Sequence, residues 1–560
     1  MSVVLGLNEF FHDTAAALVV DGRVAGLIEQ ERLDRRKHAE GFALLGPPPW
    51  EAIDWCLERA GMRRADVDQI VVSFDADLVR ALGVLRDLFQ GNRRRTTPWQ
   101  TLLNRSHLSD PALNFLGGLT WGMARRAAFL RRLSRSCRAP ITTVNHHQAH
   151  AASAYFPADV DHGAVIVMDG MGDASPTTIW EGRGDELLLR ELYPDAQDSL
   201  GILYRTISLA LWFHFMDAGK TMGLSAYGTP RPEFDAMLEV GPERYRIHWD
   251  VVRRITGLHR RRRGELTTLH KDLAASVQAR LEEAGLLLAR RAMARTGSRS
   301  ICLAGGVALN CNTNSRIRLE TDAASVYVQP GAMDMGCALG AALLGAARLG
   351  ESPERGFSVY SGPSYPSQEV EDALSRSGLR YRRVADPAQE AAERLARREV
   401  VAWFQGAMEF GPRALGARSI LANPDRIETR DRVNRVKQRE AWRPLAPVIL
   451  EEKLGEWVED PVRSPYMTFT FRFKPHQATR VPAVVHVDGT ARVQSVSGQD
   501  LPVFHAVLQR FEALTGIPVL MNTSFNNRGE PIVCSPLEAI RTYRTMQVDA
   551  LIIGSFVATI

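Results

Sequence analysis

Lysine and cysteine are scarce in this chain of 560 residues. Only six of its 69 basic residues are lysine, so a lysine inside a motif is more informative than an arginine. The six cysteines are dispersed and form no CxxC pair. That spacing argues against a disulfide framework and against a thiolate zinc site. We therefore expect reduced thiols.

Long apolar runs and a strong net charge are also missing. No apolar stretch is long enough to span a bilayer, and the N-terminal MSVVLGLNEFF lacks the basic and apolar segments of a signal peptide. The net charge is only +5, which gives no case for nucleic-acid binding. Two arginine runs, at 93–95 and 260–263, are interpreted as solvated loops because no aromatic residues interleave them. We predict a cytoplasmic protein with no membrane and no nucleic-acid partner.

The composition that is present is typical of a folded globular protein. Hydrophobic residues make up 45% and charged residues 24%, so the chain can bury enough surface to fold. At roughly 150 residues per domain, its length predicts more than one domain.

A pattern of strand, glycine-containing polar turn and hairpin occurs twice in the first 200 residues. We predict an internally duplicated α/β unit, with two unrelated hairpins as the alternative. The polar turns leave backbone amides free to meet a phosphate or a metal. The apolar runs of the two copies are Val3–Leu7, Ala15–Val20 and Val24–Glu29, then Ala164–Met168, Thr177–Trp180 and Glu186–Leu192.

Strand–loop–helix units continue to about residue 350. The segment 350–366 is rich in Gly, Pro and Ser and is the predicted linker. Beyond it, expected helices and a strand at Val400–Phe404 indicate a second α/β domain. The predicted domains are residues 1–355 and 356–560.

A histidine pair is the sharpest local signal. His146 and His150 are four residues apart, which on a helix places both rings on one face. Asp169 follows an apolar strand, and Asp334 follows another. Two imidazoles and two carboxylates suit Fe(II), Mn(II) or Zn(II) equally well. His147 points away from that face and is expected to be structural.

Three further features of the first domain have anion or acid–base chemistry. The Gly305-Gly306 pair precedes a helix, where glycine allows a close backbone approach to a phosphate. Lys220 lies in GKTMG, which is not a Walker A motif but could hold a phosphate. His12 lies in the first polar turn, where it could be a general base or only satisfy the hairpin.

Cations converge in the second domain without matching acids. The segments 409–419 and 437–444 carry several arginines and a lysine, and NTSFN at 522–526 adds short polar groups. Such a set describes a site for a small, multiply charged anion and a nucleotide phosphate, with surface ion pairs as the alternative for any single arginine. We expect Arg413 and Lys437 to face the solvent as anion ligands.

Taken together, these motifs resemble the O-carbamoyltransferases of the nodulation-protein-U, cephem and tobramycin carbamoyltransferase family. The resemblance extends over the whole chain. It rests on LGLNEFFHDTAAAL, EQERLDRRKH, HHQAHAASAY, MDGMGD, GKTMGLSAYG, GGVALNCN, QPGAMDMGCALGAA, EFGPRALGARSIL, KQREAWRPLAP and NTSFNNRGEPIV. It implies a large N-terminal domain of the actin-like ATPase (ASKHA, duplicated ribonuclease-H-like) class, followed by a YrdC-like α/β domain that forms carbamoyl-adenylate.

The resemblance also implies roles for residues. The expected metal ligands, with Fe(II) as the ion, are His146, His150, Asp169 and Asp334. Lys220, Gly305, Gly306 and Asn310 match the region that holds the adenylate nucleotide, and His12 matches the histidine of carbamoyl transfer. The carbamoyl phosphate and ATP site is matched by Arg413, Lys437, Arg443, Arg492, Asn522 and Ser524. Of these, Arg413 and Lys437 are expected to be catalytic, as is His12 in the transfer site.

The implied reaction has two halves. Carbamoyl phosphate and ATP, with Mg(II), form carbamoyl-adenylate in the second domain, and the carbamoyl group then passes to a hydroxyl of a small-molecule acceptor in the first. A tRNA threonylcarbamoyl-type modification enzyme and a non-catalytic ATP-binding protein remain alternatives. A homodimer remains open as the assembled state.

The acceptor is expected to contact the insert between Asp75 and Ser136. Its many apolar residues favour a mostly neutral secondary metabolite, such as a macrolide, ansamycin or glycoside, over an aminoglycoside. The alternative is that they form the insert's own helical core. They are Leu88, Phe89, Trp99, Leu102, Leu103, Phe115, Leu116 and Trp121.

Overall fold

The computed structural model of the chain describes residues 1–9, 12–39, 48–74, 111–170, 172–173, 175–257 and 264–560. The side chains of Ala39 and of residues 111–123 are not described. The apolar side chains expected to contact the acceptor therefore lie outside the described part of the chain. So do the arginine runs at 93–95 and 260–263.

The first sheet is built around the N-terminal strand. β1 (Val3–Asn8) pairs antiparallel with β2 (Ala15–Val20), and β2 with β3 (Arg23–Glu29). On its other side β1 pairs in parallel with β4 (Gln69–Val72), and β4 with β5 (Ile141–Thr143). The resulting order is β3-β2-β1-β4-β5.

The second sheet repeats this arrangement. Its order is β12-β11-β6-β7-β8, with an antiparallel meander followed by two parallel strands. Its strands are β6 (His162–Met168), β7 (Thr177–Arg183), β8 (Glu186–Tyr193), β11 (Ser300–Ala304) and β12 (Ser325–Val328). The same order and the same directions in both sheets confirm the predicted duplication and the actin-like α/β class.

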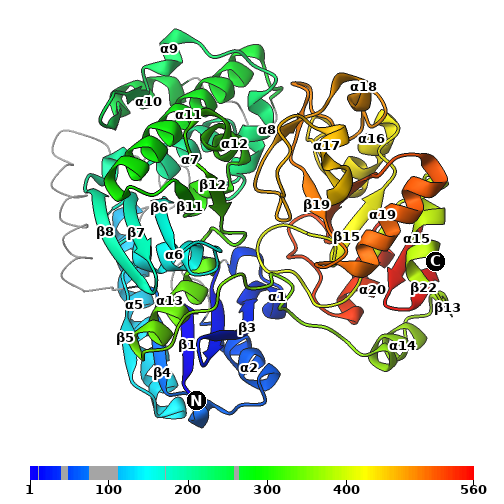
Figure 1. Cartoon of the computed structure of the whole chain (residues 1–560), viewed down its shortest axis with the longest axis horizontal. Helices are drawn as coiled ribbons and strands as arrows, with labels where there is room; N and C mark the ends of the chain where they lie inside the picture. Colours follow the sequence, from blue (N-terminus) through cyan, green and yellow to red (C-terminus); the bar gives the residue numbers. More distant parts are fainter. Residues whose placement is uncertain (10–11, 40–47, 75–110, 171, 174, 258–263) are drawn as a thin grey trace.

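Two helices fill the space between the sheets. α6 (His146–Tyr155) and α13 (Met335–Arg348) pack on each other, α13 also on β1 and β2, and α6 on β6 and β11. Figure 1 shows both helices between the sheet of β1 and the sheet of β6. Small residues allow this: a Cβ at Gly340 would lie 1.8 Å from the Ala149 carbonyl oxygen, and one at Gly6 would lie 2.2 Å from that of Ala338.

Other helices cover the outer faces of the sheets. Residues of α2 (Trp50–Arg59) and α5 (Pro111–Cys137) share a buried cluster with the first sheet. The second sheet is covered by a larger helical layer. It includes α7 (Leu200–Ala210), α8 (Ala218–Ser225), α10 (Trp249–Thr256), α11 (Thr268–Thr296) and α12 (Cys311–Glu320).

The C-terminal part has one mixed sheet of eight strands. Its order is β13-β22-β21-β14-β15-β20-β16-β19, flanked by α14 (Ser367–Ser375), α15 (Pro387–Ala396), α16 (Ile427–Val436), α19 (Pro502–Thr515) and α20 (Pro536–Thr545). The strands are β13 (Arg380–Arg383), β14 (Val401–Phe404), β15 (Arg418–Ala422), β16 (Ala446–Leu450), β19 (Gln494–Val496), β20 (Val519–Ser524), β21 (Ala550–Ile553) and β22 (Phe556–Thr559). This confirms a second α/β region; the boundary at 355/356 and the YrdC-like identity stay predictions.

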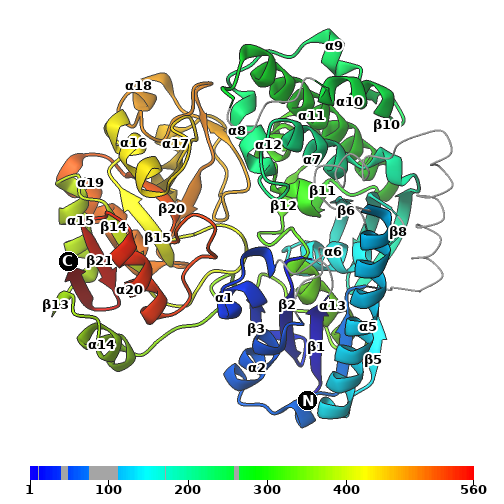
Figure 2. The ribbon, with the colours of Figure 1, turned by 180° about the vertical axis from the view of Figure 1, so that it is seen from behind.

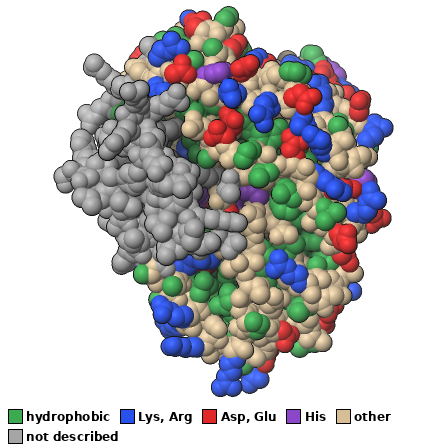
Figure 3. All heavy atoms as spheres, turned by 90° about the vertical axis from the view of Figure 1, so that its left-hand side faces the viewer, with side chains coloured by type: hydrophobic (Ala, Val, Ile, Leu, Met, Phe, Trp, Pro, Cys, Tyr) green, Lys and Arg blue, Asp and Glu red, His purple; other side chains and the backbone are tan. Residues whose placement is uncertain are grey.

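The two parts lie side by side, with the short helix α1 (Gln30–Asp34) of the first part facing the second (Figure 2). On the face shown in Figure 3, basic and acidic side chains of the described residues are interspersed. Among the described residues, none of the helices combines the length and the apolar character needed to cross a membrane.

The contact between α6 and α13 can be tested by substitution. Gly340→Ala would place a methyl group against the Ala149 carbonyl, so the helices must separate. We expect a loss of about 1–3 kcal/mol of stability, typical of overpacking, measured as a lower thermal unfolding midpoint. The matched control is Gly219→Ala in α8, where a Cβ meets nothing within 4 Å. An unchanged midpoint for Gly340→Ala would contradict the close packing.

Candidate metal and anion-binding sites

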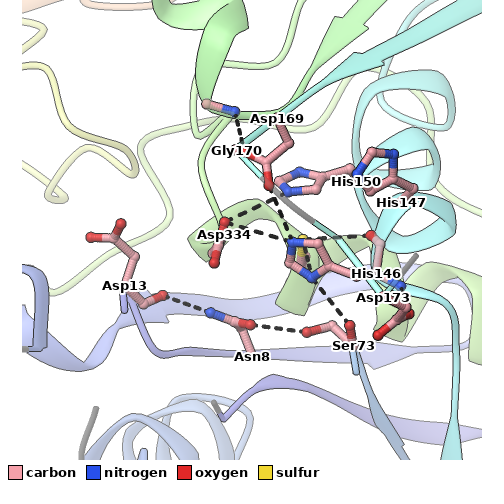
Figure 4. Close-up of polar contacts among 12 residues, drawn as sticks. Asn8, Asp13, Ser73, His146, His147, His150, Asp169, Gly170, Asp173 and Asp334 are labelled. Atoms are coloured by element: carbon pink, nitrogen blue, oxygen red, sulfur yellow. Dashed lines mark hydrogen bonds and ion pairs between the residues drawn. The ribbon is translucent and has the colours of Figure 1, made fainter. Parts of the chain in front are cut away.

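Four predicted metal ligands converge between the two sheets. One ligand atom from each of His146, His150, Asp169 and Asp334 lies within 4.8 Å of the others. Nε2 of His146 is 3.7 Å from a carboxylate oxygen of Asp169 and from one of Asp334, and Nε2 of His150 is also 3.7 Å from Asp334. Figure 4 shows the two rings facing the two carboxylates. The structure thus brings together all four residues of the predicted site.

The local structure explains this convergence. The histidines lie one turn apart in the first turns of α6, Asp169 follows the last residue of β6, and Asp334 is the N-cap of α13. His146 also has a supporting network: its Nδ1 lies 3.3 Å from the Ser73 carbonyl oxygen, and its backbone N–H donates to Asp173. A bond at Nδ1 fixes the ring so that Nε2 faces the cluster. No motif in the sequence indicated that Ser73 would take part.

The glycine pair Gly305-Gly306 supports the four candidate metal ligands, which we call the metal cluster from here on. Gly305 has a φ of +87°, and a Cβ there would lie 2.3 Å from the Met168 carbonyl oxygen, so glycine is required. The next backbone N–H, of Gly306, donates to Oδ1 of Asp169 at 3.0 Å. This glycine pair therefore orients a candidate metal ligand. Its nucleotide role stays a prediction.

Two side chains next to the cluster are His147, whose orientation was predicted from the sequence, and Cys337, which was not predicted. His147 points away, as predicted: its Nδ1 contacts Thr178 Oγ1 at 3.0 Å, and burial lowers its pKa to about 3. Cys337 was missed, although its thiol lies 3.9 Å from Nδ1 of His146. Cys337 is three residues after Asp334, one turn along α13, and that spacing is the signal that could have found it.

The cluster has the chemistry of a cation site. Both ring nitrogens of His150 are buried and have no hydrogen-bond partner among the described residues. Burial lowers the pKa of this histidine, but Cys337 and Asp334 outweigh it and raise the pKa to about 9. Asp169 is also buried, and its histidine neighbours hold its pKa well below the usual value. A divalent cation would replace the protons that these rings otherwise bind, so the residues fit a metal.

His12 lies directly beside the metal cluster. Its Nδ1 is 2.8 Å from Oδ2 of Asp13 and 3.8 Å from Oδ2 of Asp334. Burial lowers its pKa, but Asp334 and Asp13 raise it to about 9 overall. Asn8 fixes the turn by donating to the carbonyl oxygens of His12 and Asp13, both at 3.1 Å. This position is consistent with acid–base work on a ligand held at the cluster.

The second site is a pocket between the two parts of the chain. The first part lines it from α8 and from the start of α12, and the second part supplies the cations. Four arginines line it: Arg413, Arg439, Arg443 and Arg492. The predicted Asn522 and Ser524 line it as well. The structure thus brings together five of the six predicted residues. That the first part of the chain also lines the pocket could not be predicted from the sequence.

The arginines repel one another. Burial and the neighbouring Arg492 lower the pKa of Arg413 to about 9, and burial and Arg443 do the same for Arg439. Arg439 was not singled out from the sequence, although it lies in the predicted KQREAWRP segment. Like-charged groups held this closely are stabilised by a bound polyanion.

Lys437 corrects an expectation. It was expected to face the solvent, but it is 2% exposed. Its ammonium donates to the Ser524 carbonyl at 2.6 Å, to Oδ1 of Asn526 at 2.6 Å and to the Asn526 carbonyl. All three N–H groups therefore have acceptors, and through them the lysine holds the loop after β20 in place. Its catalytic role stays a prediction.

Two residues grouped with the adenylate nucleotide have other contacts. Lys220 lines the pocket between the two parts, where its ammonium lies 3.0 Å from Asp217 and 3.2 Å from Glu440. Asn310 caps α12 and exchanges hydrogen bonds with Gln278 at 2.9 and 3.0 Å. Their nucleotide contacts stay predictions.

The chain belongs to the carbamoyltransferase family. A family model described as carbamoyltransferase N-terminus matches residues 3–343, and one described as carbamoyltransferase C-terminus matches residues 392–559. The protein is therefore a member of a transferase family, with an actin-like first domain.

Named relatives extend over most of the chain. The nodulation protein NolNO of Sinorhizobium fredii is 38% identical over 98% of this chain and 79% of its own. The 3'-hydroxymethylcephem-O-carbamoyltransferase of Amycolatopsis lactamdurans is 35% identical over 60% of this chain and 64% of its own. Among solved structures, HypF of T. kodakarensis matches at 14% identity and a TM-score of 0.37, over 62% of this chain and 48% of its own.

Removing a ligand should empty the metal cluster. We expect His146→Ala and Asp334→Asn each to weaken metal binding by at least about 10- to 100-fold, measured by plasma emission on chelator-washed, remetallated protein. His162→Ala is the control, since that histidine pairs with Glu181 away from the cluster. Full metal content in His146→Ala would show that the four residues are not its ligands.

Substitution of Arg413, which lines the pocket, and of the buried Lys437 should affect thermal stability differently. Without an anion, Arg413→Ala relieves repulsion and should not lower the unfolding midpoint, but it should reduce the stabilisation that added pyrophosphate gives. Lys437→Met removes a buried donor from three oxygens and should cost about 1–3 kcal/mol. Thermal shifts with and without pyrophosphate measure both. Equal stabilisation of Arg413→Ala and the parent by pyrophosphate would remove Arg413 from the anion site.

Proposed function

We propose that this protein is an ATP-dependent O-carbamoyltransferase that works through carbamoyl-adenylate. The observation that carries the proposal is the presence of two sites in one chain. One is a pocket lined by arginines and suited to phosphates, and the other is a buried cluster of candidate metal ligands beside His12. Membership of the carbamoyltransferase family supports it.

The pocket would carry out the first half-reaction. Water attacks the phosphorus of carbamoyl phosphate, the bond from phosphorus to the bridging oxygen breaks, and phosphate and carbamate result. The carbamate oxygen then attacks the α-phosphorus of ATP, and pyrophosphate leaves. Arg413, Arg439, Arg443 and Arg492 would bind the phosphates and stabilise the charge that develops on the leaving group. Mg(II) would accompany ATP.

The first domain would carry out the transfer. His146, His150, Asp169 and Asp334 would hold a divalent metal, with Fe(II) our proposal for the ion. When bound, the metal supplies an anchor for the adenylate and a Lewis acid for its carbonyl. The acceptor oxygen attacks the carbamoyl carbon, AMP leaves, and the hydroxyl proton must go to a base.

His12 would accept that proton. Its Nδ1 is bound to Asp13, so Nε2 is the nitrogen that would face a substrate. Because Asp334 raises the pKa of His12, neutralising Asp334 with a bound cation lowers that pKa again. Metal binding would therefore favour the neutral, basic form of the histidine.

The acceptor would be a small molecule with a free hydroxyl. One relative, the 3'-hydroxymethylcephem-O-carbamoyltransferase of Amycolatopsis lactamdurans, is named for a hydroxymethylcephem substrate. We propose a secondary metabolite for this chain, with macrolides, ansamycins and glycosides as the classes to test first.

The deciding experiment is mass spectrometry of reactions that contain ATP, carbamoyl phosphate and a panel of hydroxyl compounds. We expect a gain of about 43 daltons, the mass of HNCO, on one class of acceptor, and none when ATP or carbamoyl phosphate is omitted. A gain that is independent of ATP would refute the adenylate route.

His12→Asn should stall the reaction after the adenylate forms. Asparagine is similar in size and keeps one hydrogen bond, but it accepts no proton near neutral pH. Transfer should slow by about 10²- to 10⁴-fold, as for loss of a general base, while pyrophosphate release continues. Rapid-quench analysis measures both. Parental transfer by His12→Asn would leave His12 as a turn residue only.

A further inference from the structure

One short segment of the first domain contacts both sites. It runs from Glu29, the last residue of β3, through α1 to His38, and we call it the 29–38 segment. Its first half binds the turn that carries Arg413, and its last residue binds the aspartate that holds His12. Figure 2 shows α1 at the face of the first domain that meets the second.

The first half of the segment forms hydrogen bonds with a single glycine of the second domain. Glu29 accepts a hydrogen bond from the Gly411 N–H at 2.8 Å, and Arg32 donates to the Gly411 carbonyl at 2.8 Å. Arg32 is 2% exposed and also pairs with Glu29 at 3.1 Å and Glu31 at 2.8 Å. Both backbone groups of Gly411 are therefore held by charged side chains of the other domain.

Gly411 is two residues before Arg413, so the 29–38 segment is attached to the turn that carries this arginine. Its φ is +101°, and a Cβ there would lie 3.0 Å from the Pro330 carbonyl oxygen. A Cβ at Gly331, three residues before Asp334, would lie 2.3 Å from the ring of Phe410. The turn thus lies between the 29–38 segment and the loop that leads to a candidate metal ligand.

A second arginine anchors the same segment to another loop of the second domain. Arg35 donates to the carbonyl oxygens of Ile532 at 2.7 Å and Pro531 at 2.9 Å, and it lies 3.3 Å from Glu538. These contacts place α1 between two loops of the second domain.

The far end of the segment reaches His12. Nδ1 of His38 lies 3.0 Å from Oδ1 of Asp13, and the Asp13 N–H donates to the His38 carbonyl at 2.9 Å. The other oxygen of Asp13 holds His12 at 2.8 Å. Within the segment, Glu31 joins the two ends, since it pairs with Arg32 and accepts from the His38 N–H at 2.5 Å.

We propose that the 29–38 segment is a strut that sets His12 relative to the second domain, with Arg32 and Arg35 as positioning residues for carbamoyl transfer. This inference rests on the proposed function. A guanidinium suits the task because its planar donors hold the Gly411 carbonyl and two carboxylates at once, which a lysine cannot do. Misplacing a reacting group by about 1 Å can cost 10²-fold in rate.

The test compares two products in the same reaction. Arg32→Lys and Arg35→Gln are assayed with ATP, carbamoyl phosphate and the first panel compound that gains 43 daltons. Pyrophosphate and carbamoylated product are both counted. We expect product per pyrophosphate to fall by about 10-fold or more while pyrophosphate release changes much less. A general loss of stability would instead lower both products together.

Arg64→Gln is the matched control, because Arg64 pairs with Asp54 in the same domain, away from both sites. It should keep the parental ratio. If Arg32→Lys does not fold, Arg35→Gln carries the test alone, since that side chain is 26% exposed. A parental ratio in Arg35→Gln, or an equal fall of both products, would overturn the strut. Failure of the proposed function would instead appear in the parent, as an absence of pyrophosphate.

Discussion

The metal cluster depends on how closely α6 and α13 approach each other. α6 supplies both histidines, and Asp334 is the N-cap of α13, so the distance between the helices sets the distance between ligands. Gly340 allows the contact because no Cβ separates it from the Ala149 carbonyl. A second glycine, Gly336, lets the first turn of α13 lie against the Gly331 carbonyl. The chemistry of the first domain thus rests on backbone packing between two sheets of the same topology.

Unbalanced charge is the corresponding constraint at the second site. Four arginines share one pocket, with Glu440 and Asp217 as the acidic groups that act on them. Their mutual repulsion and their burial lower the pKa of Arg413 and Arg439, which means that the protein holds these charges at a cost in free energy. A bound polyanion would lower that cost, so the charge of this pocket favours anionic ligands.

Local patterns predicted much of the fold and of the first site. Two similar strand patterns predicted the duplication, and the spacing of His146 and His150 predicted a shared helix face. Contacts between distant segments were not accessible in this way. Nothing local to Lys437 shows that its ammonium is enclosed by the loop after β20. Nor does GKTMG show that Lys220 lines a pocket with arginines of the second domain. The sequence shows which side chains are cationic. The hydrogen-bond acceptors around each one are set by tertiary packing and could not be predicted from local patterns.

The most direct test of two separate, cooperating sites is exchange of labelled pyrophosphate into ATP without any acceptor. Carbamate and ATP are in equilibrium with carbamoyl-adenylate and pyrophosphate, so the pocket between the two parts should support exchange without the metal ligands. The account predicts exchange that requires carbamoyl phosphate and continues in metal-depleted protein, because the pocket does not include the metal cluster. Exchange that stops when the metal is removed, or that proceeds without carbamoyl phosphate, would contradict it.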